Sequence, residues 1–226
     1  MIKRAVFINR EVAEKYSDFA SYVQSRVLTF IVDDRSTVRE KMREFDLSIF
    51  VGRDAQRFAG DNWADVDYLC VNFGSGNDRR IGCINVDVRP DVRAELIDDL
   101  SKCEFKFPPI KKAILFDVLE HFSWREVEKV FGRIVEQLAR PGVLYLRVPA
   151  VERIFYQVVK RGVRMHYKEE YLELSYFLGG GQDYPENTHR TFFTRRGIKE
   201  LMEKFGLKHK CVSDGGTNWQ CVAIKR

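Results

Sequence analysis

The first part of the chain alternates between short apolar runs and segments that are compatible with helices. The apolar runs cover residues 5–8, 27–32 and 47–52 and are rich in β-branched and aromatic side chains, which favours strands. Residues 12–22 and 36–45 lie between these runs and suit helices. Strands that alternate with helices predict a parallel sheet with crossover connections.

A polar stretch, Gly60-Asp61-Asn62, follows the last of these runs and marks a domain boundary. We therefore expect residues 1–62 to form a small N-terminal α/β extension, and residues 63–226 to form the main domain. The extension carries no ligand motif. It is interpreted as a structural or oligomerisation element, through which the chain could form a homo-oligomer. A role in contacting the substrate is the alternative.

Helical periodicity is clearest in the main domain. Residues 123–138 place apolar side chains on one face, and Ser123 and Glu126 form a capping box at the start. Pro141-Gly142 ends this helix, and the apolar run 143–149 predicts a strand. A second helix is expected at 194–205, followed by an antiparallel hairpin of residues 208–212 and 220–224 around Asp214-Gly215-Gly216.

An irregular segment rich in aromatic residues connects the strand at 143–149 to the last helix. It spans about residues 150–193 and is interrupted by Gly179-Gly180-Gly181. Long connections of this kind are often lids or binding loops. We expect a lid or a wall of the substrate site here; a helical cap that only packs on the sheet is the alternative.

Polar residues end several apolar runs in succession. The run 66–71 leads into Asn72-Phe73-Gly74-Ser75-Gly76, the next ends at Asp87, and later ones end at Asp98-Asp99 and at Asp117 to His121. Open α/β sheets bind ligands at the carboxyl ends of their strands, so these residues are expected to line one site. The paired glycines suit a tight loop that a ligand approaches closely.

Composition and cysteine usage set wider limits. The formal net charge of +5 is mildly basic, which neither requires nor excludes a polyanionic partner. No apolar stretch is long enough for a membrane span, so no membrane partner is expected. The odd number of cysteines and the absence of a Cys-x-x-Cys motif favour reduced thiols in a cytoplasmic protein. The cysteines are Cys70, Cys83, Cys103, Cys211 and Cys221.

The order of these motifs resembles class I S-adenosylmethionine-dependent methyltransferases, in particular the small-molecule and sugar-type branch that is similar to methyltransferase type 11. The resemblance covers roughly residues 66–224, and its motifs are specific through their order and spacing. It implies a Rossmann-like sheet of seven strands with the last antiparallel. The matching motifs are Val71-Asn72-Phe73-Gly74-Ser75-Gly76, Asn85-Val86-Asp87, Leu119-Glu120-His121, Pro141-Gly142, Val148-Pro149 and Asn187-Thr188-His189-Arg190.

The resemblance also implies a set of residues that bind S-adenosylmethionine. The glycine loop would contact the methionine part, Asp87 the ribose hydroxyls, and Asp99 with the Leu100 backbone the adenine, with Asp98 competing for the role of Asp99. Asp117 and Val118 would lie near the reactive methyl group. The complete expected cofactor set is Asn72, Gly74, Ser75, Gly76, Asp87, Val88, Asp99, Leu100, Asp117 and Val118.

Two features depart from common nucleotide-binding patterns. Asn72 occupies the position where the family usually has an acid. The next acid, Asp87, follows after only 87 − 72 = 15 residues, against about 20 in dinucleotide-binding folds, which leaves little room for a helix that would bind a pyrophosphate. The short interval therefore favours S-adenosylmethionine over a nicotinamide dinucleotide.

The expected activity is O-methylation of a small-molecule or glycan acceptor. A hydroxyl nucleophile gains from a general base, and the candidates are His121 and His189. No cluster of His, Asp or Glu has the spacing of a metal site along the chain, so no metal is expected. A degenerate, non-catalytic partner subunit and an RNA methyltransferase are the alternatives. The basic residues near 190–204 have the spacing of a solvated helix face, so nucleic acid is not the expected partner.

Overall fold

The computed structural model describes residues 1–33, 38–160 and 173–226. The chain divides into two compact units. Unit 1 comprises Met1–Ile114 and Glu136–Gly142, and unit 2 comprises Leu115–Val135 and Val143–Arg226. Residues 36 and 37 of the helix expected at 36–45, and Tyr167 and Tyr171 of the aromatic segment, lie outside the described residues.

A four-stranded parallel sheet forms the N-terminal part of unit 1. Its strand order is β2-β1-β3-β4, and β1 pairs in parallel with both β2 and β3. The expected parallel strands are therefore confirmed. The fourth strand pairs in parallel with β3 and begins directly after the polar stretch at residues 60–62. The strands are β1 (Arg4–Asn9), β2 (Leu28–Val32), β3 (Leu47–Gly52) and β4 (Trp63–Asp65).

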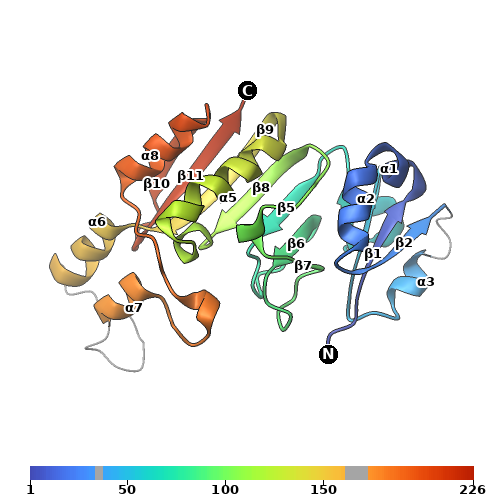
Figure 1. Ribbon diagram of the computed structural model, residues 1–226, viewed down its shortest axis with the longest axis horizontal. Helices are drawn as coiled ribbons and strands as arrows, with labels where there is room; N and C mark the ends of the chain where they lie inside the picture. Colours follow the sequence, from blue (N-terminus) through green and yellow to red (C-terminus); the bar gives the residue numbers. More distant parts are fainter. Residues whose placement is uncertain (34–37, 161–172) are drawn as a thin grey trace. The chain divides into compact units, whose positions relative to one another are not determined.

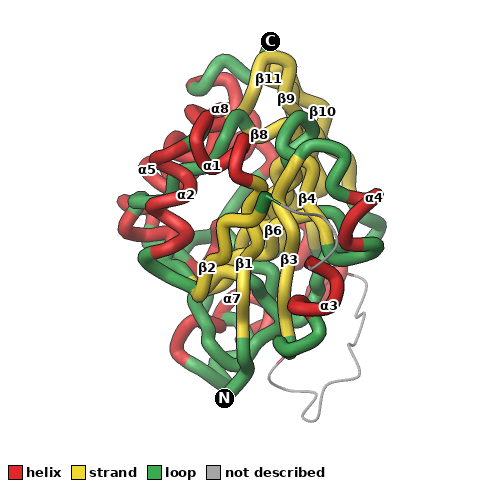
Figure 2. The backbone as a smooth tube through the Cα atoms, turned by 90° about the vertical axis from the view of Figure 1, so that its right-hand side faces the viewer, coloured by secondary structure: helices red, strands yellow, loops and turns green. Residues whose placement is uncertain are grey.

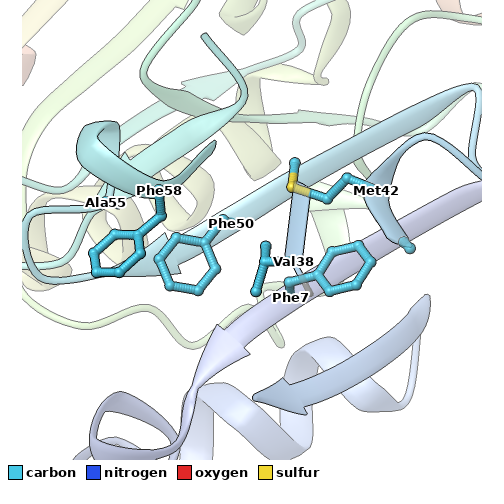
Figure 3. Packing of buried hydrophobic residues seen from close by; sticks show 7 residues of the cluster. Phe7, Val38, Met42, Phe50, Ala55 and Phe58 are labelled. Atoms are coloured by element: carbon cyan, nitrogen blue, oxygen red, sulfur yellow. The ribbon is translucent and has the colours of Figure 1, made fainter. Parts of the chain in front are cut away.

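Four short helices cover this sheet on both faces, α1 and α2 on one side and α3 and α4 on the other (Figure 2). Phe7 and Phe50 project from neighbouring strands into a cluster with Val38, Met42 and Phe58 of the second face (Figure 3). Successive strand residues point to opposite faces, so β1 contributes apolar side chains to both layers. The helices are α1 (Arg10–Lys15), α2 (Ser17–Gln24), α3 (Val38–Met42) and α4 (Gln56–Ala59).

The second sheet has seven strands in the order β10-β11-β9-β8-β5-β6-β7 (Figure 1). Strands β5, β6 and β7 pair in parallel, while β10 and β11 form the expected antiparallel hairpin. This is the Rossmann-like sheet expected for class I methyltransferases, with the last strand antiparallel. The strands are β5 (Cys70–Phe73), β6 (Cys83–Asp87), β7 (Leu96–Ile97), β8 (Ile110–Phe116), β9 (Leu138–Pro149), β10 (Lys208–Ser213) and β11 (Asn218–Lys225).

Both predicted long helices are present. Helix α5 (Trp124–Gln137) begins at the expected cap, where the carboxylate of Glu126 accepts hydrogen bonds from the Ser123 backbone N–H and hydroxyl. Helix α8 (Arg195–Lys204) begins at Thr194, whose hydroxyl accepts from Gly197 N–H. The two helices lie side by side: the rings of Phe131 and Phe205 are 5.6 Å apart (Figure 1).

The aromatic segment contains helical pieces where the structure describes it. These are α6 (Val151–Ile154), the π-helical η3 (Phe155–Lys160), α7 (Glu173–Gly179) and the 3-10 turn η5 (Pro185–Asn187). Its assignment as a lid stays a prediction. Among the described residues, no helix has both the length and the apolar character that crossing a membrane requires.

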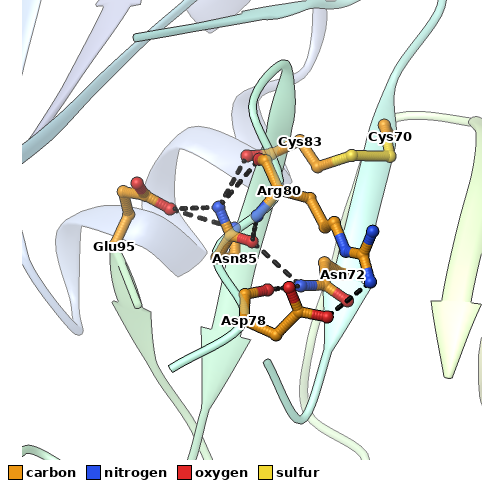
Figure 4. The surroundings of a disulfide bond; sticks show 7 residues. All are labelled: Cys70, Asn72, Asp78, Arg80, Cys83, Asn85 and Glu95. Atoms are coloured by element: carbon orange, nitrogen blue, oxygen red, sulfur yellow. Dashed lines mark hydrogen bonds and ion pairs between the residues drawn. A yellow bond between two sulfur atoms is a disulfide. The ribbon is translucent and has the colours of Figure 1, made fainter. Parts of the chain in front are cut away.

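The expectation of reduced cysteines is wrong for four of the five residues. Cys70 and Cys83 form a disulfide between β5 and β6 (Figure 4). Cys211 and Cys221 form another across the β10–β11 hairpin. In both cases the two cysteines are direct partners in the strand register, with Cα atoms 4.4 Å and 4.1 Å apart. Register, and not spacing along the chain, brings the sulfur atoms together. The prediction of a cytoplasmic location was based on reduced thiols, so the two disulfides remove its basis.

Candidate functional site

The glycine loop after β5 has the open geometry that a ligand needs. Gly74 and Gly76 adopt positive φ angles of 60° and 51°, which side chains rarely tolerate. The Ser75 N–H donates to Val86 O, which fixes the loop against β6. A Cβ built on Gly76 would have no heavy atom within 4 Å, so the space beside this residue is open.

Asp87 ends strand β6 beside that loop and within unit 1. One carboxylate oxygen accepts from the Gly76 N–H at 2.7 Å, and the other accepts from the Arg89 N–H at 2.9 Å. Each oxygen keeps a second lone pair, so the buried carboxylate can still accept from a diol. The neighbouring Val88 has 40% of its surface exposed and offers an apolar contact. These groups fit the adenosine part of S-adenosylmethionine.

Asn72 belongs to a buried polar network below the loop (Figure 4). Its side-chain amide donates to Asp78 O and to the Asn85 side-chain oxygen, both at 3.0 Å. Asn85 in turn donates to Glu95, which is paired with Arg79. Both amide hydrogens of Asn72 are bound to acceptors within the protein, so Asn72 helps to order the loop. A contact between Asn72 and the cofactor stays a prediction.

The two adjacent acids after β7 have different surroundings. Buried Asp98 accepts hydrogen bonds from the Tyr22 hydroxyl and the Arg26 guanidinium, both on or next to α2. Asp99 is partly exposed and caps the 3-10 turn η1 (Leu100–Lys102), where it accepts from the Ser101 N–H and hydroxyl. Asp98 is thus engaged with the N-terminal extension. Asp99 and Leu100 remain the predicted adenine contacts.

In unit 2, strand β8 ends in a constrained turn. Asp117 has a positive φ of 56°, and its carboxylate forms a bidentate ion pair with Arg147 of β9. Uncommon backbone angles in non-glycine residues often occur at functional sites. Val118 is buried directly after it. The predicted contacts of Asp117 and Val118 with the methionine end of the cofactor remain predictions.

The turn continues into the 3-10 helix η2 (Leu119–His121), which starts a compact cluster of donor groups. His121 and His189 lie edge to face with ring centroids 5.2 Å apart. One carboxylate oxygen of Glu120 and one nitrogen of each ring lie within 4.8 Å of one another. The structure therefore brings the two predicted catalytic histidines together and adds Glu120, which was not predicted as a site residue.

The hydrogen bonds of the two rings define their tautomers. Nδ1 of His121 bonds to Thr188 O at 3.3 Å, and Nδ1 of His189 bonds to Phe177 O at 3.2 Å. A carbonyl oxygen only accepts, so each Nδ1 carries the proton and each Nε2 carries a lone pair. Burial lowers the pKa of both histidines, and the proximity of His121 lowers the pKa of His189 further. Both rings therefore favour the neutral form.

Glu120 is fully enclosed, with 1% of its surface exposed. Burial raises the pKa of its carboxyl group well above the usual value, and the charge of Asp117 adds to the effect. Among the described residues, neither carboxylate oxygen has a hydrogen-bond partner. The sequence feature that could have identified Glu120 as a site residue is its position directly after the apolar pair Val118-Leu119.

Backbone hydrogen bonds hold His189 against this turn. The N–H groups of Arg190 and Thr191 both donate to Glu120 O, at 2.7 Å and 3.1 Å. The His189 N–H donates to Gly179 O. The segment after η5 is thus fixed to η2 although the two are far apart in the sequence.

Comparisons with known proteins agree with this architecture. The family model described as a methyltransferase domain matches residues 27–212, which is most of the chain and includes much of the N-terminal extension. No curated protein sequence matches this chain. A S-adenosylmethionine-dependent methyltransferase from Archaeoglobus fulgidus has a similar structure, with a TM-score of 0.50 and 11% identity, covering 85% of this chain and 95% of the other.

A second similar structure is the plantazolicin methyltransferase BamL, solved with a triazolic desmethylPZN analog and SAH. Its TM-score is 0.50 at 8% identity, covering 70% of this chain and 77% of BamL. At such low identity these likenesses establish the fold alone, whereas the family match extends over most of the sequence. The chain belongs to the methyltransferase-domain family and is a class I methyltransferase enzyme.

Proposed function

We propose that the enzyme transfers a methyl group from S-adenosylmethionine to a hydroxyl oxygen of a small molecule or glycan. The observation that carries the choice of oxygen is the pair His121 and His189, two imidazoles in contact in a half-buried cluster, each with Nδ1 bound to a backbone carbonyl and with a lowered pKa. A hydroxyl must lose its proton as it is methylated, and a neutral imidazole is suited to accept it.

The glycine loop and Asp87 are the groups that suit the cofactor. S-adenosylmethionine, when bound, provides a methyl group on a sulfonium, which leaves as a neutral thioether. Asp87 would accept from the ribose hydroxyls with the lone pairs that Gly76 and Arg89 leave free. The open space beside Gly76 would admit the ligand next to the loop. These residues bind and orient; they take no part in bond breaking.

His121 and His189 are the groups that suit the acceptor. As the acceptor oxygen forms a bond to the methyl carbon, the carbon–sulfur bond breaks and its electron pair stays on sulfur. The hydroxyl proton moves to Nε2 of one histidine and from there to solvent. General-base assistance of this kind is worth about 10²–10⁴-fold in rate.

The cationic face of α8 gives little support to the RNA alternative. Arg196 is paired with Glu200 of the same helix at 2.7 Å, and Lys204 with Glu128 of α5 at 2.6 Å. Side chains that are already paired with carboxylates add less to the attraction of phosphates than free ones.

The test uses S-adenosylmethionine with a deuterated methyl group and a panel of phenols, catechols, sugars and nucleosides, with mass spectrometry of the products. We expect transfer to a hydroxyl oxygen. His121→Ala and His189→Ala should each lower kcat by about 10²–10⁴-fold with unchanged cofactor affinity. His209→Ala is the matched control, because His209 lies on β10 beside Glu203 and outside the cluster. Wild-type kcat in both cluster variants, or transfer to nitrogen or RNA alone, would rule out the proposal.

A further inference from the structure

We propose that Glu120, His121 and His189 form a binding site for a divalent transition-metal cation. Two imidazoles and one carboxylate form a donor set that such ions favour. The three donor atoms already lie within 4.8 Å of one another. The prediction that no metal is required relied on spacing along the chain, which does not bring His189 next to Glu120.

The first support is the unpaired carboxylate. Glu120 is buried, and among the described residues both of its oxygens lack a hydrogen-bond partner. Arg147, whose charge acts on Glu120, already forms a bidentate pair with Asp117, and among the described residues Glu120 forms no ion pair of its own. A buried polar group without a partner costs free energy, and protonation would leave a buried hydroxyl in the same position. A bound dication would satisfy the carboxylate directly.

The second support is the orientation of the imidazoles. Each Nδ1–H donates to a backbone carbonyl, Thr188 O for His121 and Phe177 O for His189. Histidines that bind metals commonly donate their second N–H to a carbonyl or carboxylate, which fixes the ring and leaves the other nitrogen for the ion. In both rings here, Nδ1 is already bound to a backbone carbonyl oxygen, as in such sites.

The geometry also restricts the choice of ion. Ligand bonds of about 2.0–2.2 Å place neighbouring donors roughly 3–3.5 Å apart. Side-chain rotations that move the donor atoms by about 1 Å would therefore close the site. Two imidazoles favour Zn²⁺, Co²⁺ or Fe²⁺ over Mg²⁺ or Ca²⁺, which prefer oxygen ligands. Three protein ligands leave at least one coordination position open.

The open position gives the cation a role in catalysis, and this part rests on the proposed function. An acceptor hydroxyl bound to the cation would have a lowered pKa and would lose its proton to solvent before its oxygen forms the bond to the methyl carbon. His121 and His189 would then act as ligands in place of a general base. The acceptor class narrows to compounds whose hydroxyl oxygen can bind a metal, such as catechols or vicinal diols.

The binding test uses the full chain after treatment with a chelator. Titration with Co²⁺ alone, followed by visible absorption, and with Zn²⁺ alone, followed by calorimetry, should each give one site per chain, with much weaker binding of Mg²⁺. Glu120→Gln and His189→Ala should weaken Co²⁺ binding at least about 100-fold, while His209→Ala leaves it unchanged. Circular dichroism and the affinity for SAH establish that each variant is folded. No Co²⁺ or Zn²⁺ binding at millimolar concentration, or binding that is unchanged in both folded cluster variants, would overturn the inference.

Activity assays separate this inference from the proposed function. If the cation binds at the cluster and no hydroxyl compound is methylated, the metal site stands and the proposed function fails. If hydroxyl methylation continues at the full rate in the metal-free enzyme, the function stands and the catalytic role of the cation is overturned.

Discussion

The carboxylate of Asp87 accepts a hydrogen bond of 2.7 Å from the backbone N–H of Gly76. This bond joins the end of β6 to the open glycine loop, so the acid expected to bind ribose also holds the loop in place. Removing the charge of Asp87 should therefore affect both the direct contact with the cofactor and the shape of the loop.

Asp87→Asn should weaken the binding of S-adenosylmethionine and SAH by about 10- to 100-fold. A hydrogen bond to a charged group contributes about 1.5–3 kcal/mol, and asparagine replaces one acceptor oxygen by a donor. Calorimetry with SAH measures the change. Asp91→Asn is the control, because Asp91 pairs with Arg89 at the exposed surface of the same segment. Equal affinities of Asp87→Asn and Asp91→Asn would contradict the assignment.

The contact between Tyr22 and Asp98 should stabilise unit 1. The Tyr22 hydroxyl donates to buried Asp98 at 2.7 Å, and burial together with Asp98 raises the pKa of Tyr22. Tyr22→Phe removes a donor from a buried carboxylate and should lower the free energy of unfolding by about 1–3 kcal/mol. Urea denaturation followed by circular dichroism measures this. Tyr68→Phe is the control, because Tyr68 is 74% exposed. Equal stability of the two variants would show that the Tyr22–Asp98 contact contributes nothing.

Gly180 should control the position of His189. Gly180 has a positive φ of 75°, and a Cβ there would overlap Asn187 O and approach the His189 ring to 3.0 Å. Gly180→Ala should lower kcat at least about 10-fold while SAH affinity stays unchanged, since small displacements of catalytic groups have large effects on rate.

The neighbouring Gly179→Ala provides the control for Gly180. A Cβ at Gly179 meets only the side chain of Gln182, which can move, and the φ of Gly179 is not positive. This variant should retain nearly full kcat. A similar loss of kcat in both variants would mean that the segment tolerates no added side chain, and that Gly180 has no special part in positioning His189.

The disulfide between Cys70 and Cys83 should contribute to the stability of unit 1. It closes a segment with a sequence separation of 13 that contains the glycine loop. Closing a loop of this length is worth about 3 kcal/mol in the chain-entropy model, so Cys70→Ser with Cys83→Ser should lower the free energy of unfolding by a few kcal/mol. Urea denaturation of the double variant and the wild type measures the difference.

Alkylation under denaturing conditions checks the cysteine pairing itself. Without a reductant, only Cys103 should react, because the other four cysteines are joined in two disulfides. After reduction, all five cysteines of the chain should react. Alkylation of all five before reduction would mean that the thiols are reduced, as the sequence had suggested.

The sequence predicted those parts of the fold that depend on local patterns. The helix beginning after Ser123 follows from its capping box and its apolar face, and the hairpin follows from the turn at Asp214-Gly215-Gly216. The seven-stranded sheet with its last strand antiparallel was predicted only through the resemblance of the motifs to a family, and the strand order came from the structure. Local periodicity, together with the order of motifs that resembles the family, therefore predicted most of the architecture.

The parts that the sequence did not predict depend on contacts between distant segments. Register pairs Cys211 with Cys221, and packing of α2 engages Asp98, leaving Asp99 as a turn cap. Among the described residues the Glu120 carboxylate has no hydrogen-bond partner, a property that depends on every residue around it and that no local pattern reveals. The two histidines were predicted individually, but their mutual contact required the fold.

The most direct test of the central claim is calorimetry of the purified wild-type chain with S-adenosylmethionine and with SAH. The open glycine loop and the buried carboxylate of Asp87 predict one binding site per chain with a dissociation constant in the micromolar range, weakened by Asp87→Asn. Absence of any heat of binding up to millimolar concentration of either compound would contradict the claim that this chain is a working S-adenosylmethionine-dependent methyltransferase.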